Sequence, residues 1–417
     1  MTSQKPIREN LLVALLAAAQ FTHIVDFMIM MPMGDILQRE LLITPFQFSA
    51  LVSAYPLAAF LSSLFGVFFL DKFDRKKALV VAYSGFVLGT FSSAVVPTTA
   101  DPELNYILFI CTRLLTGLAG GILSALVLSI IGDVIPLERR GRAMGYVTMA
   151  FSLAAVLGVP LALELVNRFD GNWHLPFYLV SAMGGVVVTL VVVLIPPIRI
   201  HLEKQITRPH PFETLRKARQ LPNQRRALLF MVLLVLGQFT VIPFITPYMI
   251  NNVGLTQAQI PLIYLVGGAC TTLSSPFVGR MVDRFGRKPV FYTMALGSTA
   301  PLLLVTHVTD APLAAVLTIA GVFFIFISGR MIPANTMLTT VVRPENRGGF
   351  MSLNASVMSL ASGSAALISG SIVSQSAEGM PLVGFNTVGY IAVTFTLLAF
   401  FLGYTMKENS GEAPSKQ

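Results

Sequence analysis

Charged residues are scarce in this sequence. Asp, Glu, Lys and Arg make up 12% of its 417 residues, whereas hydrophobic residues make up 54%. A typical soluble domain has about 25% charged residues, because polar side chains must cover its surface. This shortage indicates that most of the protein's surface faces lipid, and it predicts a membrane protein.

Cysteine is also rare, and several kinds of chemical site are absent. The two cysteines, Cys111 and Cys270, lie in apolar stretches, which disfavours disulfides and Cys-based metal sites. The sequence shows no spaced metal ligands, no nucleophile with a base and no nucleotide-binding motif. We therefore expect no enzyme, no metal and no cofactor. The net charge of +9 comes from short runs between apolar stretches rather than a solvated basic domain, so we expect no nucleic-acid partner.

Long apolar runs dominate what remains. A helix that crosses about 30 Å of hydrocarbon needs about 20 mostly apolar residues. The sequence predicts twelve such helices, at 11–33, 46–70, 78–97, 106–132, 143–166, 176–196, 227–250, 257–280, 290–306, 312–341, 350–374 and 383–405. No clear cleavage site follows the N-terminal residues, so we interpret the first apolar run as a membrane span rather than a signal peptide.

The positions of Lys and Arg predict the orientation of these spans. Of the 29 such residues, Arg113 and Arg330 lie inside predicted spans and Arg39 and Arg168 lie on one side, which leaves 25 on the other. Loops rich in Lys and Arg stay in the cytoplasm. The pattern predicts a bacterial inner-membrane protein with both termini cytoplasmic.

The chain divides into two similar halves. Residues 1–196 and 227–405 each contain six spans, a polar cytoplasmic linker covers 197–226, and 406–417 form a cytoplasmic tail. "VFFLDKFDRKKAL" in the first half matches "GRMVDRFGRKPVF" in the second, and "ERRGRAMG" matches "ENRGGFMS". Asp71 precedes Asp283 by 212 positions, and Glu138 precedes Glu345 by 207. Duplicated halves with a site between them at mid-membrane are typical of secondary transporters.

These motifs resemble those of the major facilitator superfamily over nearly the whole chain. The family's Gly-x-Leu-x-Asp-Arg-x-Gly-Arg-Lys signature is matched at Gly279, Asp283, Arg284, Gly286, Arg287 and Lys288. The first copy keeps Asp71, Arg75 and Lys76, but Val67 and Asp74 replace its glycines. The run "RLLTGLAGG" from Arg113 is similar to a further family motif. The resemblance implies all-α architecture with two pseudo-symmetric six-helix bundles and alternating access.

The signature also implies a gate. Arg75 can pair with Asp133, and by resemblance Asp71, Arg75, Asp133 and Asp283 latch the cytoplasmic side in the outward-open state. The alternative is that these basic residues only determine the membrane topology, and we favour this alternative for the lysines. Gly286 permits a backbone angle that other residues avoid. The second half lacks an acid matching Asp133, so a latch there is weaker or differently built.

Gly158 and Pro160 in "AVLGVPLAL" resemble a shortened antiporter motif of sugar-efflux-like and drug-efflux-like bacterial members. Proline removes one backbone hydrogen bond and kinks a helix, so these residues predict a bend where another helix slides. A static kink is the alternative.

Four ionisable residues lie well inside spans: His23, Asp26, Arg113 and Arg330. A charged residue at mid-membrane costs about 2.5–3.5 kcal/mol on insertion scales, and such residues are functional candidates. Asp26 is the only acid deep inside any span, and we expect it to titrate during transport or to stay paired with Arg113. Its place three residues after His23 puts both on one helical face. His23 is therefore a candidate proton relay, with a structural histidine as the favoured alternative.

Other polar residues are weaker candidates. Arg330 must pair with Asp26, with backbone carbonyls or with an anionic substrate. Gln238 and Asn354 are uncharged cavity candidates, although helix–helix hydrogen bonds explain them equally well. We expect Asp35 and Glu164 to lie at the outer rim. The run Met28, Met30, Met31 and Met33 suits an adaptable wall for ligands, but lipid-facing filler is the favoured interpretation.

Together these features predict a secondary transporter, most simply a monomer, whose partners are a small-molecule substrate, protons and the bilayer. The favoured function is proton-coupled export of small amphipathic compounds, either drug-like or metabolic. The alternative is transport of an anionic metabolite such as a siderophore or organic acid, in either direction. A membrane enzyme or receptor is disfavoured.

Overall fold

The computed structural model describes residues 9–69, 72–199, 220–342, 347–376 and 379–406. Its first half contains α1 (Glu9–Ile29), α2 (Gly34–Glu40), α3 (Pro45–Phe69), α4 (Arg75–Ala94), α5 (Pro102–Val134), α6 (Leu137–Leu153), the π-helical turn η2 (Ala154–Gly158), α7 (Val159–Arg168) and α8 (His174–Leu194). Its second half contains α11 (Pro222–Phe239), α12 (Ile242–Asn251), the short η3 (Gln257–Gln259), α13 (Ile260–Phe285), α14 (Arg287–Gly297), α15 (Thr299–His307), α16 (Leu313–Thr340), α17 (Arg347–Ile372) and α18 (Phe385–Thr405).

These helices form twelve candidate membrane spans, six in each half. Their number and order confirm the prediction of an all-α membrane protein. In the described part of the chain, β structure is limited to one isolated bridge between Ser374 and Val383. Most of the 197–226 segment lies outside the described residues, and so does the 407–417 tail.

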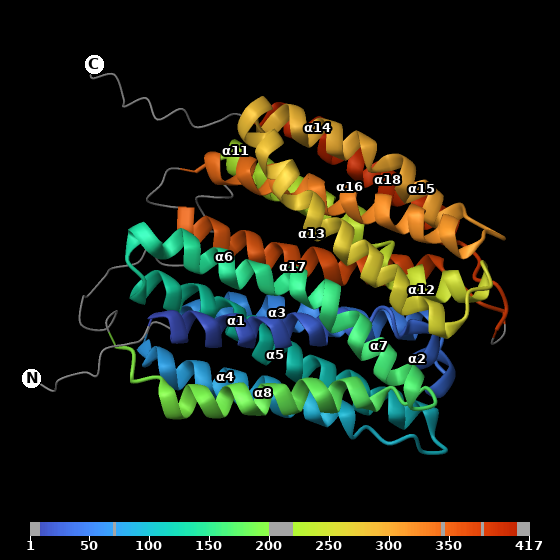
Figure 1. Cartoon of the computed structure of the whole chain (residues 1–417), viewed down its shortest axis with the longest axis horizontal. Coiled ribbons are helices and arrows are strands. Elements are labelled where there is room, and N and C mark those ends of the chain that lie inside the picture. The colour runs from blue at the N-terminus through green and yellow to red at the C-terminus, as the bar shows by residue number, and fades with distance from the viewer. Residues whose placement is uncertain (1–8, 70–71, 200–219, 343–346, 377–378, 407–417) are drawn as a thin grey trace, which may run out of the picture.

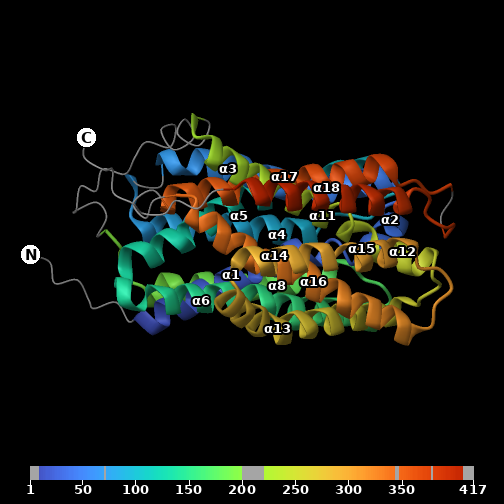
Figure 2. The same ribbon diagram turned by 90° about the horizontal axis from the view of Figure 1, so that it is seen from above.

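The two halves lie side by side along their length (Figure 1). In both views α3 of the first half runs next to α17 of the second (Figures 1 and 2). The Ser53 hydroxyl donates to the Gly363 carbonyl over 2.8 Å, and the Ser63 and Ser356 hydroxyls are 2.9 Å apart. Small residues let these two helices approach closely, as is usual for helix packing in membranes.

The bundle has two distinct ends. Helix α1 begins and α18 ends at the same end (Figure 1), which also carries the starts of α4 and α14; we call it the basic end. At the opposite end the halves meet closely. A Cβ added to Gly268 on α13 would lie 3.0 Å from the backbone of Ala155, whereas one added to Gly279, nearer the basic end of α13, would meet nothing within 4 Å. The contact of α13 with the π-helical turn therefore lies away from the basic end, whereas the contact of α3 with α17 extends toward the basic end at Ser63 and Ser356.

The first and seventh spans both break in the outer half of the bundle. Helix α1 ends at Ile29 and α2 begins at Gly34, while α11 ends at Phe239 and α12 begins at Ile242. The first predicted span, 11–33, corresponds to α1 and runs four residues past its end at Ile29. Pro32 and Pro243, which cannot donate a helical N–H, follow these two helix ends in corresponding places of the two repeats.

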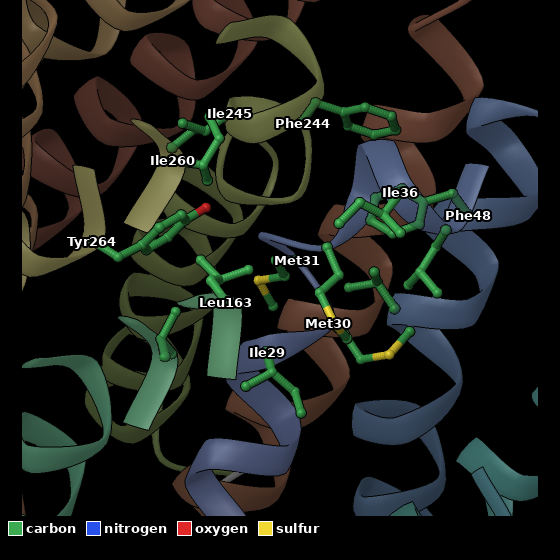
Figure 3. Close-up of a cluster of buried hydrophobic side chains, with 14 of the residues drawn as sticks. Ile29, Met30, Met31, Ile36, Phe48, Leu163, Phe244, Ile245, Ile260 and Tyr264 are labelled. Carbon is green, nitrogen blue, oxygen red and sulfur yellow. The ribbon is translucent and has the colours of Figure 1, made fainter. Parts of the chain in front are cut away.

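This break also changes the interpretation of the methionine run. Met30, Met31 and Met33 are at most 4% exposed, so the expectation that they face lipid is wrong. The turn between α1 and α2 points them into an apolar cluster shared by both halves. Figure 3 shows Met30 and Met31 among other members of this cluster, which we call the apolar plug: Ile29, Ile36, Phe48, Leu163, Phe244, Ile245, Ile260 and Tyr264.

Polar contacts seal the same end. The Asn251 amide on α12 donates to Asp35 on α2 over 2.7 Å, and Asn167 on α7 donates to the Gln257 carbonyl over 3.3 Å. Asp35 is 5% exposed, so its expected place at a hydrated rim is wrong. Glu164, with a side chain 46% exposed beside Arg168, lies at the rim as predicted.

Candidate functional site

Asp26 lies in the middle of the first half, and its side chain is fully buried. One carboxylate oxygen accepts a hydrogen bond from Arg113 on α5 over 2.9 Å, and the other accepts one from the Thr90 hydroxyl on α4 over 3.1 Å. The structure thus shows the predicted Asp26–Arg113 ion pair. Thr90 could not be singled out from the sequence, because hydroxyl residues are common in these spans.

Aromatic rings complete the surroundings of Arg113. Its guanidinium carbon lies 5.0 Å from the centre of the Tyr55 ring and 5.9 Å from that of Phe177, distances at which a ring face attracts a cation. Its Nε has no hydrogen-bond partner among the described residues. Removing one member of a buried ion pair costs about 3–5 kcal/mol, because the remaining charge is uncompensated. The pair therefore joins α1 firmly to α5 while Asp26 is ionised.

His23 occupies a different environment from Asp26. It is partly exposed, and its ring lies 5.8 Å from each of the rings of Tyr55 and Phe86. Its Nε2 is 3.4 Å from the Ser124 hydroxyl, and its Nδ1 has no partner among the described residues. No hydrogen bond between described residues joins it to Asp26. A proton-relay role for His23 therefore remains a prediction.

One face of α1 reaches the second half through Phe27. Gln20, His23 and Phe27 follow the spacing of a single helical face, and all three are partly exposed. The Phe27 ring lies 6.0 Å from that of Phe239 on α11 and 5.6 Å from that of Tyr55 on α3. Sequence reasoning missed Gln20 and Tyr55, although Gln20 lies one turn before His23 and that spacing was a usable signal.

Arg330 on α16 is buried without a carboxylate partner. Its guanidinium donates to the hydroxyls of Ser298 over 3.0 Å and Thr396 over 2.8 Å, and to the Leu234 carbonyl over 3.3 Å. No Asp or Glu of the described residues forms an ion pair with it, so pairing with Asp26, one of the three predicted options, is excluded in this structure. The backbone-carbonyl option is present, with two hydroxyls that were not predicted.

The two uncharged candidates differ. Gln238 lies 212 positions after Asp26, the same spacing as the repeated motif, and it is partly exposed. Asn354 is 3% exposed; its amide donates to the Met358 sulfur over 3.2 Å, and its carbonyl oxygen has no partner among the described residues. Gln238 is therefore accessible in this conformation, whereas Asn354 is enclosed in its own helix packing.

The first copy of the signature forms a buried ionic contact. Arg75 at the start of α4 is fully buried, and its Nε lies 3.0 Å from Asp133 near the end of α5, as predicted. Asp71 lies outside the described residues. Asp74 caps α4 by accepting from the Lys76 N–H over 2.9 Å, and it pairs with Arg199 over 2.9 Å. Burial opposes ionisation of Asp74, but these hydrogen bonds outweigh it and lower the pKa of its carboxyl.

The second copy is more open. Asp283 and Arg284 are exposed, Arg287 is partly buried, and Asp283 forms no ion pair with another described residue. Gly286 joins α13 to α14 with a φ of +86°, which confirms the predicted need for glycine. The latch role of Asp283 remains a prediction.

A π-helical turn interrupts the fifth span where Gly158 and Pro160 predicted a bend. Gly158 packs against the Val25 side chain of α1, and the backbone of the same turn contacts Gly268 of α13. This turn therefore touches the helix that carries Asp26 as well as the second half. Within the described residues, no group of three or more His, Cys, Asp or Glu side chains could hold a metal ion.

Comparisons with known proteins agree with this architecture. The profile of the Major Facilitator Superfamily matches residues 16–242 and 227–417. The uncharacterized MFS-type transporter YceJ of Bacillus subtilis is 24% identical over 397 residues, 94% of each chain. A chloramphenicol efflux pump of Mycobacterium tuberculosis is 24% identical over 70% of this chain and 68% of its own. A probable sugar efflux transporter of Helicobacter pylori is 24% identical over 61% of each chain.

Solved structures show the same fold. A crystal structure of a D-xylose-proton symporter superimposes with a TM-score of 0.78 at 16% identity, covering 97% of this chain and 99% of that one. Because the family profile spans both six-span halves, the chain belongs to the Major Facilitator Superfamily and is a multi-pass membrane transporter, not an enzyme.

Proposed function

We propose that this transporter exports small amphipathic compounds in exchange for protons, with Asp26 as the proton carrier. The observation that carries the proposal is the fully buried Asp26–Arg113 pair, 2.9 Å apart, in the middle of the first half. The basic end then faces the cytoplasm of a bacterial cell, and the protein works as a monomer across the inner membrane.

Protonation of Asp26 changes what holds α1 in place. An ionised carboxylate accepts from both Arg113 and Thr90. A proton on Asp26 neutralises it, and Arg113 then keeps only the rings of Tyr55 and Phe177 as electrostatic partners. Breaking such a pair costs about 3–5 kcal/mol, and one charge crossing 100 mV supplies about 2.3 kcal/mol. The two energies are comparable, so proton movement is able to bias α1 between two arrangements.

The aromatic residues where the halves meet favour uncharged substrates. Phe27, Phe239 and Tyr55 present aromatic surface between the halves, whereas Asp26 and Arg113 neutralise each other within the first half. The buried guanidinium of Arg330 is occupied by two hydroxyls and a carbonyl. No charge among these residues is left free to hold an ionic substrate. An aromatic wall suits a flat, largely apolar molecule, and the relative named as a chloramphenicol efflux pump points to the same class.

An anionic substrate is the second candidate function. The observation in its favour is that Arg330 carries a buried positive charge without a carboxylate among the described residues, and burial of an unpaired charge is costly. An anion that entered between α11 and α16 would relieve this cost. Arg330→Gln separates the two functions: it should abolish transport of anions but spare neutral compounds.

Transport in proteoliposomes tests the proposed function. Protein reconstituted in vesicles should accumulate a neutral amphipathic compound when a pH gradient is imposed, and an uncoupler should abolish the accumulation. Accumulation that survives complete collapse of the proton gradient would exclude proton coupling. Accumulation of benzoate but of no neutral compound would favour the anionic function instead.

A further inference from the structure

Three polar atoms at the centre of the first half lack partners. They are the Tyr55 hydroxyl, the His23 Nδ1 and the Gln20 Oε1; each is buried and has no hydrogen-bond partner among the described residues. More than nine in ten buried polar groups in proteins are hydrogen-bonded, because an unpaired one costs free energy. Three unpaired atoms on neighbouring residues therefore call for a partner from outside the chain.

The three side chains belong to one cluster. Gln20 and His23 lie one turn apart on α1, and the His23 ring centre is 5.8 Å from that of Tyr55 on α3. Helix α5 contributes Gly120 at the same place. A side chain there would collide with the Tyr55 hydroxyl and would lie 3.0 Å from His23 Nε2. The Tyr55 hydroxyl and the His23 ring therefore pack directly against the bare backbone of Gly120, and a larger residue there would displace both.

The surroundings of this cluster are largely aromatic. Phe27 continues the face of α1 on which Gln20 and His23 lie, and its ring contacts those of Tyr55 and Phe239. The Arg113 guanidinium contacts the Tyr55 ring but is already paired with Asp26. The cluster therefore offers hydrogen bonds from a hydroxyl, an imidazole and an amide beside aromatic rings, with no unpaired charge.

We propose that Tyr55, His23 and Gln20 form a binding subsite for the uncharged polar group of an aromatic substrate, such as an amide or hydroxyl. Tyr55 donates a hydrogen bond to an acceptor atom of this polar group. His23 Nδ1 and the Gln20 amide form hydrogen bonds with the neighbouring donors and acceptors of the substrate. The aromatic body of the substrate packs against Phe27 and Phe239. This subsite rests on the proposed export function, because it names the substrate class which that function carries.

Tyr55→Phe is the decisive variant, because it removes only a hydroxyl that has no partner in the protein. The probes are chloramphenicol, which is neutral and carries hydroxyl and amide groups, and tetraphenylphosphonium, an aromatic cation with no hydrogen-bonding group. We expect Tyr55→Phe to bind chloramphenicol about three- to tenfold more weakly, the loss of one neutral hydrogen bond. If the wild type binds tetraphenylphosphonium, Tyr55→Phe should bind it with the same affinity.

Tyr83→Phe is the matched control. Tyr83 is equally buried, but its hydroxyl lies 2.8 Å from that of Thr22. This variant should lower the melting temperature in detergent without changing chloramphenicol affinity, whereas Tyr55→Phe should leave the melting temperature unchanged or raise it. Gln20→Leu should reproduce the affinity loss of Tyr55→Phe.

Three results would overturn the subsite. They are unchanged chloramphenicol affinity in both Tyr55→Phe and Gln20→Leu, an equal loss for both probes, or wild-type protein that does not bind chloramphenicol. Binding and pH-driven accumulation measured in an Asp26→Asn background separate this inference from the proposed function. If Asp26→Asn still couples accumulation to the pH gradient and the Tyr55 effect persists, the subsite stands and Asp26 is not the proton carrier. If Asp26→Asn loses coupling, as the proposed function predicts, but the Tyr55 effect is absent, only the subsite is wrong.

Discussion

Neutralising one member of the Asp26–Arg113 pair should destabilise the protein far more than neutralising both. The two side chains are at most 1% exposed, and their charged atoms are 2.9 Å apart. Asp26→Asn leaves the Arg113 charge buried without a counterion, and Arg113→Met leaves the carboxylate in the same state. Each single variant should lose about 3–5 kcal/mol of unfolding free energy, whereas the double variant should recover most of that loss.

Denaturant unfolding in detergent, followed by far-UV circular dichroism, measures these differences for the wild type, both single variants and the double variant. Glu164→Gln is the control, because it breaks the exposed Glu164–Arg168 pair with the same 2.9 Å separation; it should cost at most about 1 kcal/mol. Single variants that unfold like the wild type would refute the reasoning. A double variant that loses the sum of the two single losses would refute it as well, because no coupling would then exist between the residues.

Three further changes test local features of the fold by thermal unfolding. Gly158→Ala should destabilise by about 1–3 kcal/mol, because its methyl group would collide with Val25, whereas Gly145→Ala, whose Cβ meets nothing within 4 Å, should be neutral or stabilising. Gly286→Ala should cost about 1–3 kcal/mol, because the φ of +86° excludes other residues; equal stability would contradict the turn geometry. Asp74→Ala should cost about 0.5–2 kcal/mol as a lost helix cap. The pKa of Asp74 is lowered in the folded protein, so the stabilisation by its ionised carboxyl is complete above about pH 4 and is lost as the pH falls through the folded pKa. The loss of unfolding free energy in Asp74→Ala should therefore shrink on acidification, and a loss that stays constant would contradict this.

The spans, their number and two ion pairs could be predicted from the sequence. Apolar length and the distribution of Lys and Arg depend on local composition, which is visible in one chain. The Asp26–Arg113 and Arg75–Asp133 pairs were predictable because acids are so rare in these spans that each cation had few possible partners. Scarcity made the assignment possible, since an unpaired charge in the membrane is costly.

The remaining contacts depend on how each helix is rotated and where it breaks. Hydroxyl residues are numerous, so nothing in the sequence selects Thr90 for Asp26 or Ser298 and Thr396 for Arg330. The end of α1 at Ile29 turned the methionine run into the core, and periodicity cannot detect such a break in a uniformly apolar stretch.

Asp35 shows the same limitation for tertiary contacts. Its position near a span end suggested exposure to water, but the carboxylate is buried, pairs with Arg39 and accepts a hydrogen bond from Asn251 on α12. That contact joins residues 216 positions apart, and only the packing of the two halves brings them together. Asp26 and Gln238 occupy corresponding positions of the two repeats, which the sequence alone could show. The structure adds that the helices carrying them, α1 and α11, both end just beyond these residues.

Transport by Asp26→Asn in proteoliposomes tests the central claim most directly. The account predicts that this variant still exchanges labelled for unlabelled chloramphenicol across the vesicle membrane at equal pH, because exchange needs no net proton movement. It also predicts that a pH gradient no longer drives accumulation, whereas the wild type does both. An Asp26→Asn protein that still accumulates chloramphenicol under a pH gradient would contradict the claim that Asp26 carries the coupling proton.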